Sequence, residues 1–223
     1  MKFWTHVAAI AWKDILSELR TREIITSVLV FAVLILVIFS FTFNADPQQM
    51  RQIAPGILWV AFVFSGVLAL NRAFIPEKEE GCLDGLMCCP VEREAIYIGK
   101  ALGSLFFMLL VEIVVLSAFS LLFNIAVFQP EIIVVTLLAT IGFVAVGTLF
   151  SALAINTRAR EMVLPILFLP IITPVIIAAV SAVTLTLDGK SWGDIISWLA
   201  MLIAFDVIFT VASFMVFPYI IEE

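Results

Sequence analysis

The most constraining feature of the sequence is a run of about 20 residues, 24–43, that contains no charged side chain. A helix of that length covers about 30 Å, the thickness of the hydrocarbon core of a bilayer. Five more stretches are similarly long and apolar: 57–74, 96–123, 132–155, 162–185 and 192–219. Only 13% of all residues are charged, about half the fraction in a soluble domain. The sequence therefore predicts an all-α integral membrane protein with six transmembrane helices.

The distribution of basic residues predicts how these spans are oriented. Two of the 12 lysines and arginines fall on one side of the predicted spans, Arg51 and Lys190. The others fall on the opposite side: Lys2, Lys13, Arg20, Arg22, Arg72, Lys78, Arg93, Lys100, Arg158 and Arg160. Loops rich in lysine and arginine remain in the cytoplasm. We therefore expect both termini, and the polar segment 76–100 between spans two and three, to be cytoplasmic.

Residues 1–22 have the pattern of an amphipathic helix. Apolar side chains recur there at helical spacing: Trp4, Val7, Ala8, Ala11, Ile15 and Leu19. Charged residues, among them Lys13 and Arg20, lie between them. Such a helix, with aromatic anchors and basic residues, is typical of one that lies on the anionic inner leaflet. We expect a cytosolic interfacial helix that precedes the first span.

The segment 76–100 is the only long polar insertion. Within it Leu83, Leu86 and Met87 have the i, i+3, i+4 spacing that places side chains on one helix face. Gly81 and Pro90 limit that helix to about two turns. Two interpretations stay open, because a partner protein and a lipid surface both accept an apolar helix face. The helix either docks onto a partner or lies on the membrane.

Two acids, Glu112 and Asp206, fall near the middle of predicted spans three and six. An ionised acid at that depth costs about 2.5–3.5 kcal/mol on insertion scales, so such residues face protein or a water-filled cavity. One interpretation is a path for a substrate or proton. The other is a neutral carboxyl group that forms a hydrogen bond across a helix pair.

Span five contains Pro165, Pro170 and Pro174. Each proline removes a backbone donor and clashes with the preceding turn, so we expect a kinked or broken helix. Irregular backbone in a membrane survives only where protein or water covers it. Span five is thus expected to be central and mobile, or else a static kinked packing element. In span four, Gly142 and Gly147 would let a neighbouring helix pack closely.

The sequence gives no support for enzyme chemistry, and we expect no catalytic or metal site. The fragment Gly189-Lys190-Ser191 resembles the end of a phosphate-binding loop, but Thr184 occupies the position of its first glycine. With His6 as the single histidine, no nucleophile and base set can be assembled. If the chain moves something uphill, the energy comes from elsewhere, and the cytosolic segment is the obvious place to receive it.

The run Glu80-Gly81-x-Leu83-Asp84-x-Leu86, followed by Pro90 and Lys100, resembles the coupling segment of type-2 ABC permeases, which docks a separate ATPase subunit. The whole chain resembles the CcmB family, the permeases of the cytochrome c maturation system. The likeness covers the length, the six spans, the run Pro55-Gly56-Ile57-Leu58-Trp59-Val60 and the Leu164-Pro165…Leu169-Pro170…Pro174 pattern. In that first run we expect Pro55 to open span two, at a favourable first-turn position.

The resemblance implies a single ABC permease domain, 1–223, in the bacterial cytoplasmic membrane. It assigns contact with the ATPase to Glu80, Gly81, Leu83, Asp84, Leu86, Met87, Pro90 and Lys100. It also implies a CcmA-like ATPase that binds ATP and magnesium, the heme-handling proteins CcmC and CcmD, the heme chaperone CcmE, and a second copy of the chain. No nucleic acid partner is expected.

Heme iron is usually held by His, Met, Cys or Tyr. His6, Cys82, Cys88 and Cys89 fall on the predicted cytosolic side, and Met50 alone represents these types in the outer loops. We therefore predict that the chain binds no cofactor of its own and does not ligate heme iron axially from outside. A mechanical role, which transmits ATPase motion through spans five and six, fits better than a heme pore.

Two other classes of function stay open. One is a type-2 ABC exporter of a lipid, glycan or drug, which would share the coupling segment. The other is a proton-coupled secondary transporter in which Glu112 and Asp206 form a proton relay. The first needs an ATPase, whereas the second does not.

Overall fold

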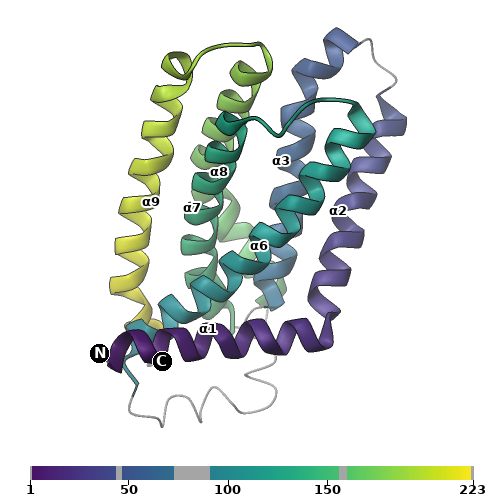
Figure 1. Ribbon diagram of the computed structural model, residues 1–223. Coiled ribbons are helices and arrows are strands. Elements are labelled where there is room, and N and C mark those ends of the chain that lie inside the picture. Colours follow the sequence, from purple (N-terminus) through teal and green to yellow (C-terminus); the bar gives the residue numbers. More distant parts are fainter. Residues whose placement is uncertain (1, 44–46, 73–90, 156–159, 222–223) are drawn as a thin grey trace.

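The computed structural model describes residues 2–43, 47–72, 91–155 and 160–221, and all regular structure in them is helical (Figure 1). The helices are α1 (Lys2–Thr21), α2 (Glu23–Thr42), α3 (Pro47–Arg72), α6 (Arg93–Phe123), α7 (Pro130–Ile155), α8 (Arg160–Leu187) and α9 (Trp192–Ile221). Six of them, α2 to α9, are long and apolar enough to cross a membrane. The expectation of an all-helical, multi-pass membrane protein with six spans is confirmed.

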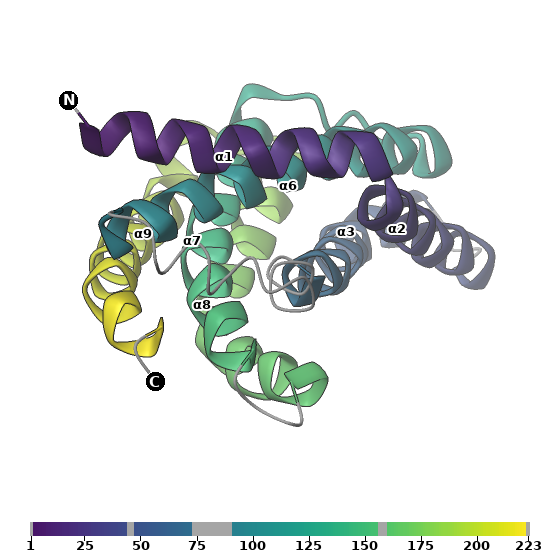
Figure 2. The ribbon, with the colours of Figure 1, turned by 90° about the horizontal axis from the view of Figure 1, so that it is seen from below.

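The six long helices run side by side, and α1 lies across one end of them, which we call the α1 end (Figures 1 and 2). The beginning of α6 and the last turn of α9 lie at this same end. At the opposite end, Arg51 of α3 and the turn at Asp188 and Gly189 line one crevice. The two basic residues expected on the outer side, Arg51 and Lys190, therefore belong to the same end of the molecule.

Helices α3 and α7 form the centre of the bundle. In each of them 67% of the spanning residues are buried, compared with 17% in α2. Helix α7 packs against α3, α6, α8 and α9. The peripheral α2 contributes only one stripe at four-residue spacing to the core, namely Val28, Ala32 and Leu36. An apolar helix that buries one stripe exposes the rest to lipid, whereas α7 exposes only a narrow stripe that includes Ile133, Leu137 and Ile141.

Glycines allow the central helices to approach one another. The ring of Phe143 on α7 occupies the notch at Gly66 of α3, where an added Cβ would lie 2.5 Å from that ring. In return, Leu70 of α3 fills the notch at Gly147 of α7. Small residues permit close helix contact in membranes, where no water drives association. The expected role of Gly147 is confirmed, and its partner is α3.

Helix α3 begins earlier than the sequence suggested. We expected Pro55 to open this span, but the helix starts at Pro47, and Pro55 lies inside it. Proline is favourable in the first turn of a helix, and Pro47 occupies that position. Met50 therefore lies in α3, packed against the core, and is not in an outer loop as the sequence indicated. The one Met assigned to the outer loops is a packing residue.

The three prolines do not break span five. Helix α8 is continuous from Arg160 to Leu187, with Pro165, Pro170 and Pro174 inside it. Helix α8 packs against α3, α7 and α9. Packing against neighbouring helices keeps proline-containing membrane helices intact, because it covers the backbone carbonyls that have lost their donors.

Candidate functional site

The predicted coupling residues divide between two parts of the chain. Most of them lie outside the described residues: Glu80, Gly81, Leu83, Asp84, Leu86, Met87 and Pro90. Lys100 is described, and it lies two turns into α6 at the α1 end. The structure therefore shows the helix that directly follows the coupling segment, and the contacts through which that helix meets the bundle.

Most residues of 95–103, near the start of α6, are buried, although Leu102 is exposed, and we call this stretch the α6 hub. Its buried residues are Ala95, Ile96, Tyr97, Gly99, Lys100 and Gly103. The hydroxyl of Tyr97 donates to the carbonyl of Ala145 on α7 at 3.0 Å. The ring of Tyr97 packs against Phe217 of α9, with 5.2 Å between ring centres. The α6 hub is thereby fixed to α7 and α9.

The other side of the α6 hub receives α1. An added Cβ at Gly99 would lie 2.8 Å from Ile10, and one at Gly103 would lie 3.3 Å from Asp14. The spacing Gly99-x-x-x-Gly103 produces a shallow groove along one helix face, which lets a second helix approach closely. Helix α1 occupies this groove.

An ion pair connects α1 to the α6 hub at the same place. Nζ of Lys100 lies 3.0 Å from Oδ2 of Asp14, and the two side chains are 3% and 17% exposed. A charge this deeply buried is stable only when it is paired, because removal of an ion from water costs several kcal/mol. Lys100, which the sequence assigned to ATPase contact, is thus directed toward α1.

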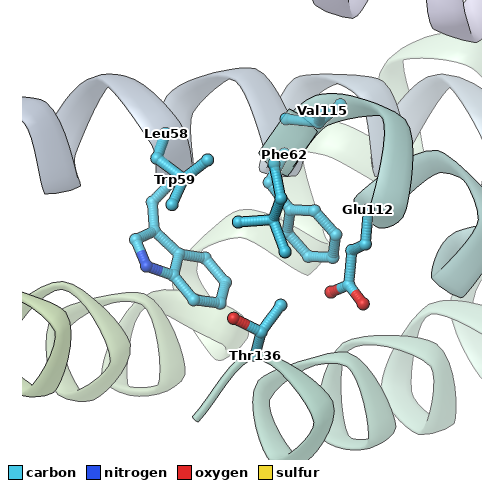
Figure 3. A pocket seen from close by; sticks show the side chains of 7 residues that line it. Leu58, Trp59, Phe62, Glu112, Val115 and Thr136 are labelled. Atoms are coloured by element: carbon cyan, nitrogen blue, oxygen red, sulfur yellow. The ribbon is translucent and has the colours of Figure 1, made fainter. Parts of the chain in front are cut away.

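Glu112 lies between α6, α3 and α7 (Figure 3). Its carboxyl group shares a hydrogen bond with the hydroxyl of Thr140, and that hydroxyl also lies 2.8 Å from the carbonyl of Thr136. A hydroxyl has one proton to donate. Both hydrogen bonds form together when the Glu112 carboxyl carries a proton and donates it to Thr140. The geometry suits a neutral carboxyl that bonds across a helix pair.

A small cavity of about 10 Å³ adjoins Glu112, lined by Trp59, Phe62 and Thr136 among others. This is room for about one water molecule. In Figure 3 the Trp59 ring lies beside Thr136, while Glu112 approaches from the other side of the cavity. The indole N–H of Trp59 is buried and has no hydrogen-bond partner among the described residues. A cavity of this size does not accommodate a larger substrate.

Asp206 lies on α9 with its carboxylate directly against Gly142 of α7. The side chain is 7% exposed, and neither oxygen has a hydrogen-bond partner within the described part of the chain. Phe205 packs beside it, stacked on Phe209 with 4.1 Å between ring centres. The sequence predicted that Gly142 admits a close neighbour, and the structure identifies the neighbours as Phe205 and Asp206.

The two acids contact opposite sides of the same helix. Thr140, the partner of Glu112, and Gly142, the neighbour of Asp206, are two residues apart on α7. Side chains with this spacing point to nearly opposite sides of a helix. Helix α7 therefore separates the two carboxyl groups. The structure brings neither into a shared cavity, and no three His, Cys, Asp or Glu side chains of the described ranges form a metal site.

Sequence reasoning missed two elements of the α6 hub, the buried pair of Lys100 with Asp14 and the interhelical bond of Tyr97. The spacing of Gly99 and Gly103 was a usable signal for the first. Nothing in the sequence identified Ala145 as the acceptor for Tyr97, since a backbone carbonyl carries no sequence signature. Pro165, Pro170 and Pro174 belong to α8, which carries neither Glu112 nor Asp206. Between these prolines, the ring of Phe168 packs on the ring of Phe143 of α7, with 4.7 Å between ring centres.

Comparisons with known proteins agree over most of the chain. The family model described as CcmB protein matches residues 5–221. Heme exporter protein B of Pseudomonas aeruginosa is 25% identical over 177 residues, which are 79% of each chain. Heme exporter protein B of Bradyrhizobium diazoefficiens is 28% identical over 80% of this chain and 81% of its own. The protein of that name from Escherichia coli K12 is 32% identical over 41% of this chain and 44% of its own.

Proposed function

The chain belongs to the CcmB family, and from this premise we propose that it is the membrane permease subunit of an ABC complex that serves heme export in c-type cytochrome maturation. The match over residues 5–221, with relatives named heme exporter protein B over about four fifths of the chain, is the observation that carries the proposal. The six apolar helices suit such a subunit.

The α6 hub supports a mechanical contribution. It directly follows the segment that resembles an ATPase-docking element, and its side chains contact α1, α7 and α9. If the ATPase displaced that segment, the force would act on the α6 hub. Because closely packed interiors are hard to compress, the hub would pass the movement on to the helices it contacts. We propose that the route runs from α6 to α7 and α9, with α8 moved through its contacts with α7.

The partners follow from the family and from the absence of any enzyme motif in the sequence. We propose that a CcmA-like subunit hydrolyses ATP, that CcmC-, CcmD- and CcmE-like proteins handle heme, and that the complex lies in the bacterial cytoplasmic membrane. The chain itself would act neither as an enzyme nor as an axial heme ligand. Two observations fit this: His6 lies in α1, at the same end as the α6 hub, and Met50 is packed inside α3.

The experiment that tests the proposal is co-purification of the ATPase subunit with the double variant Leu83→Asp plus Leu86→Asp. We expect loss of the ATPase from the complex and loss of c-type cytochromes, because two carboxylates cannot be accommodated in an apolar docking site. The matched control is Phe128→Asp, at an exposed side chain between α6 and α7. Retention of the ATPase in the double variant would contradict the proposal.

A heme titration provides an independent check. The purified chain should show no stoichiometric Soret band from axially ligated heme, whereas the complex with its heme-handling partners should. A stoichiometric axial heme on the isolated chain would refute the mechanical interpretation and favour a direct heme path.

The two alternative functions predict different results in these experiments. An ABC exporter of lipid, glycan or drug would also lose its ATPase in the double variant, but c-type cytochromes would persist. A secondary transporter would retain activity without any ATPase. The separation of Glu112 and Asp206 by α7 does not favour the relay that this last alternative needs.

A further inference from the structure

Helix α1 has three distinct faces. One face packs against the α6 hub, and its buried residues include Val7, Ile10 and Ala11. A second face is apolar but exposed, with Trp4 at 67%, Trp12 at 65%, Leu16 at 47% and Leu19 at 45%. The third face is polar. The sequence pattern placed Val7 and Ala11 in one stripe with Trp4 and Leu19, whereas the structure divides them between protein contact and exposure.

The two acids of α1 are turned toward the protein. Asp14 pairs with Lys100 of α6, and its other oxygen lies 3.2 Å from Lys13. Glu18 is 9% exposed, and its carboxylate accepts a hydrogen bond at 2.9 Å from the backbone N–H of Ile25, at the start of α2. Both negative charges are therefore engaged within the fold, although the chain as a whole has a net charge of −6.

The outward polar face of α1 is consequently basic. Lys13 keeps half of its side chain exposed, and Arg20 and Arg22 are exposed. Lys13 and Arg20 are seven residues apart, so they lie on the same side of the helix. Basic residues next to an exposed tryptophan and leucine face have the composition that binds anionic membrane surfaces.

The connection to α2 fixes the position of this surface. Arg22, in the left-handed conformation with φ 57°, joins the two helices, and α2 begins at the next residue. Helix α1 lies across the end of the spans and α2 rises from it (Figures 1 and 2). Because α2 is a span that starts directly after this turn, α1 lies at the level where hydrocarbon meets headgroups.

We propose that the outer surface of α1, formed by Trp4, Trp12, Leu16 and Leu19 with Lys13 and Arg20, is a binding surface for the anionic phospholipids of the membrane. The apolar side chains enter the boundary of the acyl chains, and the basic side chains meet the phosphate groups. Asp14 contacts Lys13 as well as Lys100, so two lysines outweigh its single negative charge and this surface keeps an excess of positive charge. The inference does not depend on the proposed transport function.

Quenching by brominated lipids tests this directly on the full-length chain. The protein is reconstituted in phosphatidylcholine vesicles that contain a minor, matched fraction of brominated phosphatidylglycerol or brominated phosphatidylcholine. The fluorescence of Trp4 and Trp12 is obtained as the difference between the wild type and the variant Trp4→Phe plus Trp12→Phe. We expect the anionic lipid to quench these tryptophans several-fold more, and the preference to shrink at high salt.

Charge variants identify the source of the preference. Lys13→Gln plus Arg20→Gln should bring the ratio of quenching by the two lipids close to one, because each basic residue contributes up to about fivefold to the affinity for an anionic surface. The matched control is Arg51→Gln plus Lys190→Gln, which removes two exposed basic residues at the opposite end of the bundle and should change nothing. Circular dichroism and gel filtration verify that each variant is folded.

Three outcomes would overturn the inference. Equal quenching by the two lipids would show that α1 has no preference for anionic headgroups. An unchanged preference in the Lys13 and Arg20 variant would place its source elsewhere. Absence of quenching by either lipid, together with protection of Trp4 and Trp12 when the ATPase subunit is added, would make the surface a protein-docking face.

Discussion

Buried acids at two levels of the molecule are compensated in different ways. At the junction of α1 with α6, Asp14 pairs with a lysine and Glu18 accepts a backbone N–H. Within the bundle, Glu112 meets a threonine hydroxyl, and Asp206 lies against Gly142 with no hydrogen-bond partner among the described residues. The first pair of acids has a cation or a backbone N–H as partner, whereas no cationic side chain is seen to pair with either acid of the second pair in the part of the chain that the structure describes.

This difference separates two uses of a carboxyl group. At the end of the bundle, a charged acid holds one helix to another and orders a turn. Between the spans, a group without a counter-charge is tolerated as a neutral polar element, because a buried charge must be paired or lost. Glu112 of α6 and Asp206 of α9 are on this view residues that pack against α7, and the ion pair at the junction is the stronger contact.

The strongest test of this difference between the two pairs of acids is removal of the negative charge of Asp14. Asp14→Asn should lower the free energy of unfolding by about 3 kcal/mol, since it removes the carboxylate beside the buried ammonium of Lys100. The midpoint of unfolding in mixed micelles titrated with SDS gives this value. The double variant Asp14→Leu plus Lys100→Met should recover most of the loss, because apolar side chains can replace a buried ion pair. A double variant as unstable as the single one would refute the interpretation.

The contact of α9 with α7 should show the next largest effect. Gly142→Ala is expected to cost about 2 kcal/mol, because the new methyl group would overlap Asp206 and lie 3.0 Å from the Phe205 ring. Gly56→Ala is the matched control, since no other side chain lies within 4 Å of that position. It should be neutral or slightly stabilising. Equal stability of both variants in the same SDS titration would mean that α9 adjusts freely.

The fold was largely predictable because a bilayer restricts what a chain can do. Runs such as 24–43 have no alternative to a spanning helix, so number and order of the spans followed from hydrophobicity. The start of α3 was misplaced because Pro47 and Pro55 satisfy the same first-turn preference. The sequence left open whether α8 is kinked or broken, because a proline signal does not include the packing that keeps such a helix continuous.

The site was less predictable than the fold. Glu112 and Asp206 were identified as unusual, but their partners Thr140 and Gly142 are ordinary residues in a membrane helix. Whether two acids share a cavity depends on which side of α7 each approaches. That is a property of helix packing, and no local pattern in α6 or α9 encodes it.

The hydrogen bond of Glu112 should contribute less than the glycine contact. Thr140→Val removes the hydroxyl and retains the volume, so we expect a loss of about 1 kcal/mol, within the range of polar contacts between membrane helices. Thr184→Val is the control, because within the described residues that hydroxyl bonds to the carbonyl of Val180 in its own helix and to no other helix. A loss no larger than that of the control would show that Glu112 gains nothing from Thr140.

Asp206→Asn should have the smallest effect on stability, below about 0.6 kcal/mol, because the acid forms no hydrogen bond within the described parts of the chain. If both acids are packing residues, strains with Asp206→Asn or Glu112→Gln should also assemble c-type cytochromes at wild-type levels, measured by heme staining against the amount of the chain. A stable Asp206→Asn protein that no longer supports assembly would contradict this. In that case the unpartnered carboxylate would be the functional group, and its separation from Glu112 by α7 would mean that each acid acts alone and not as part of a relay.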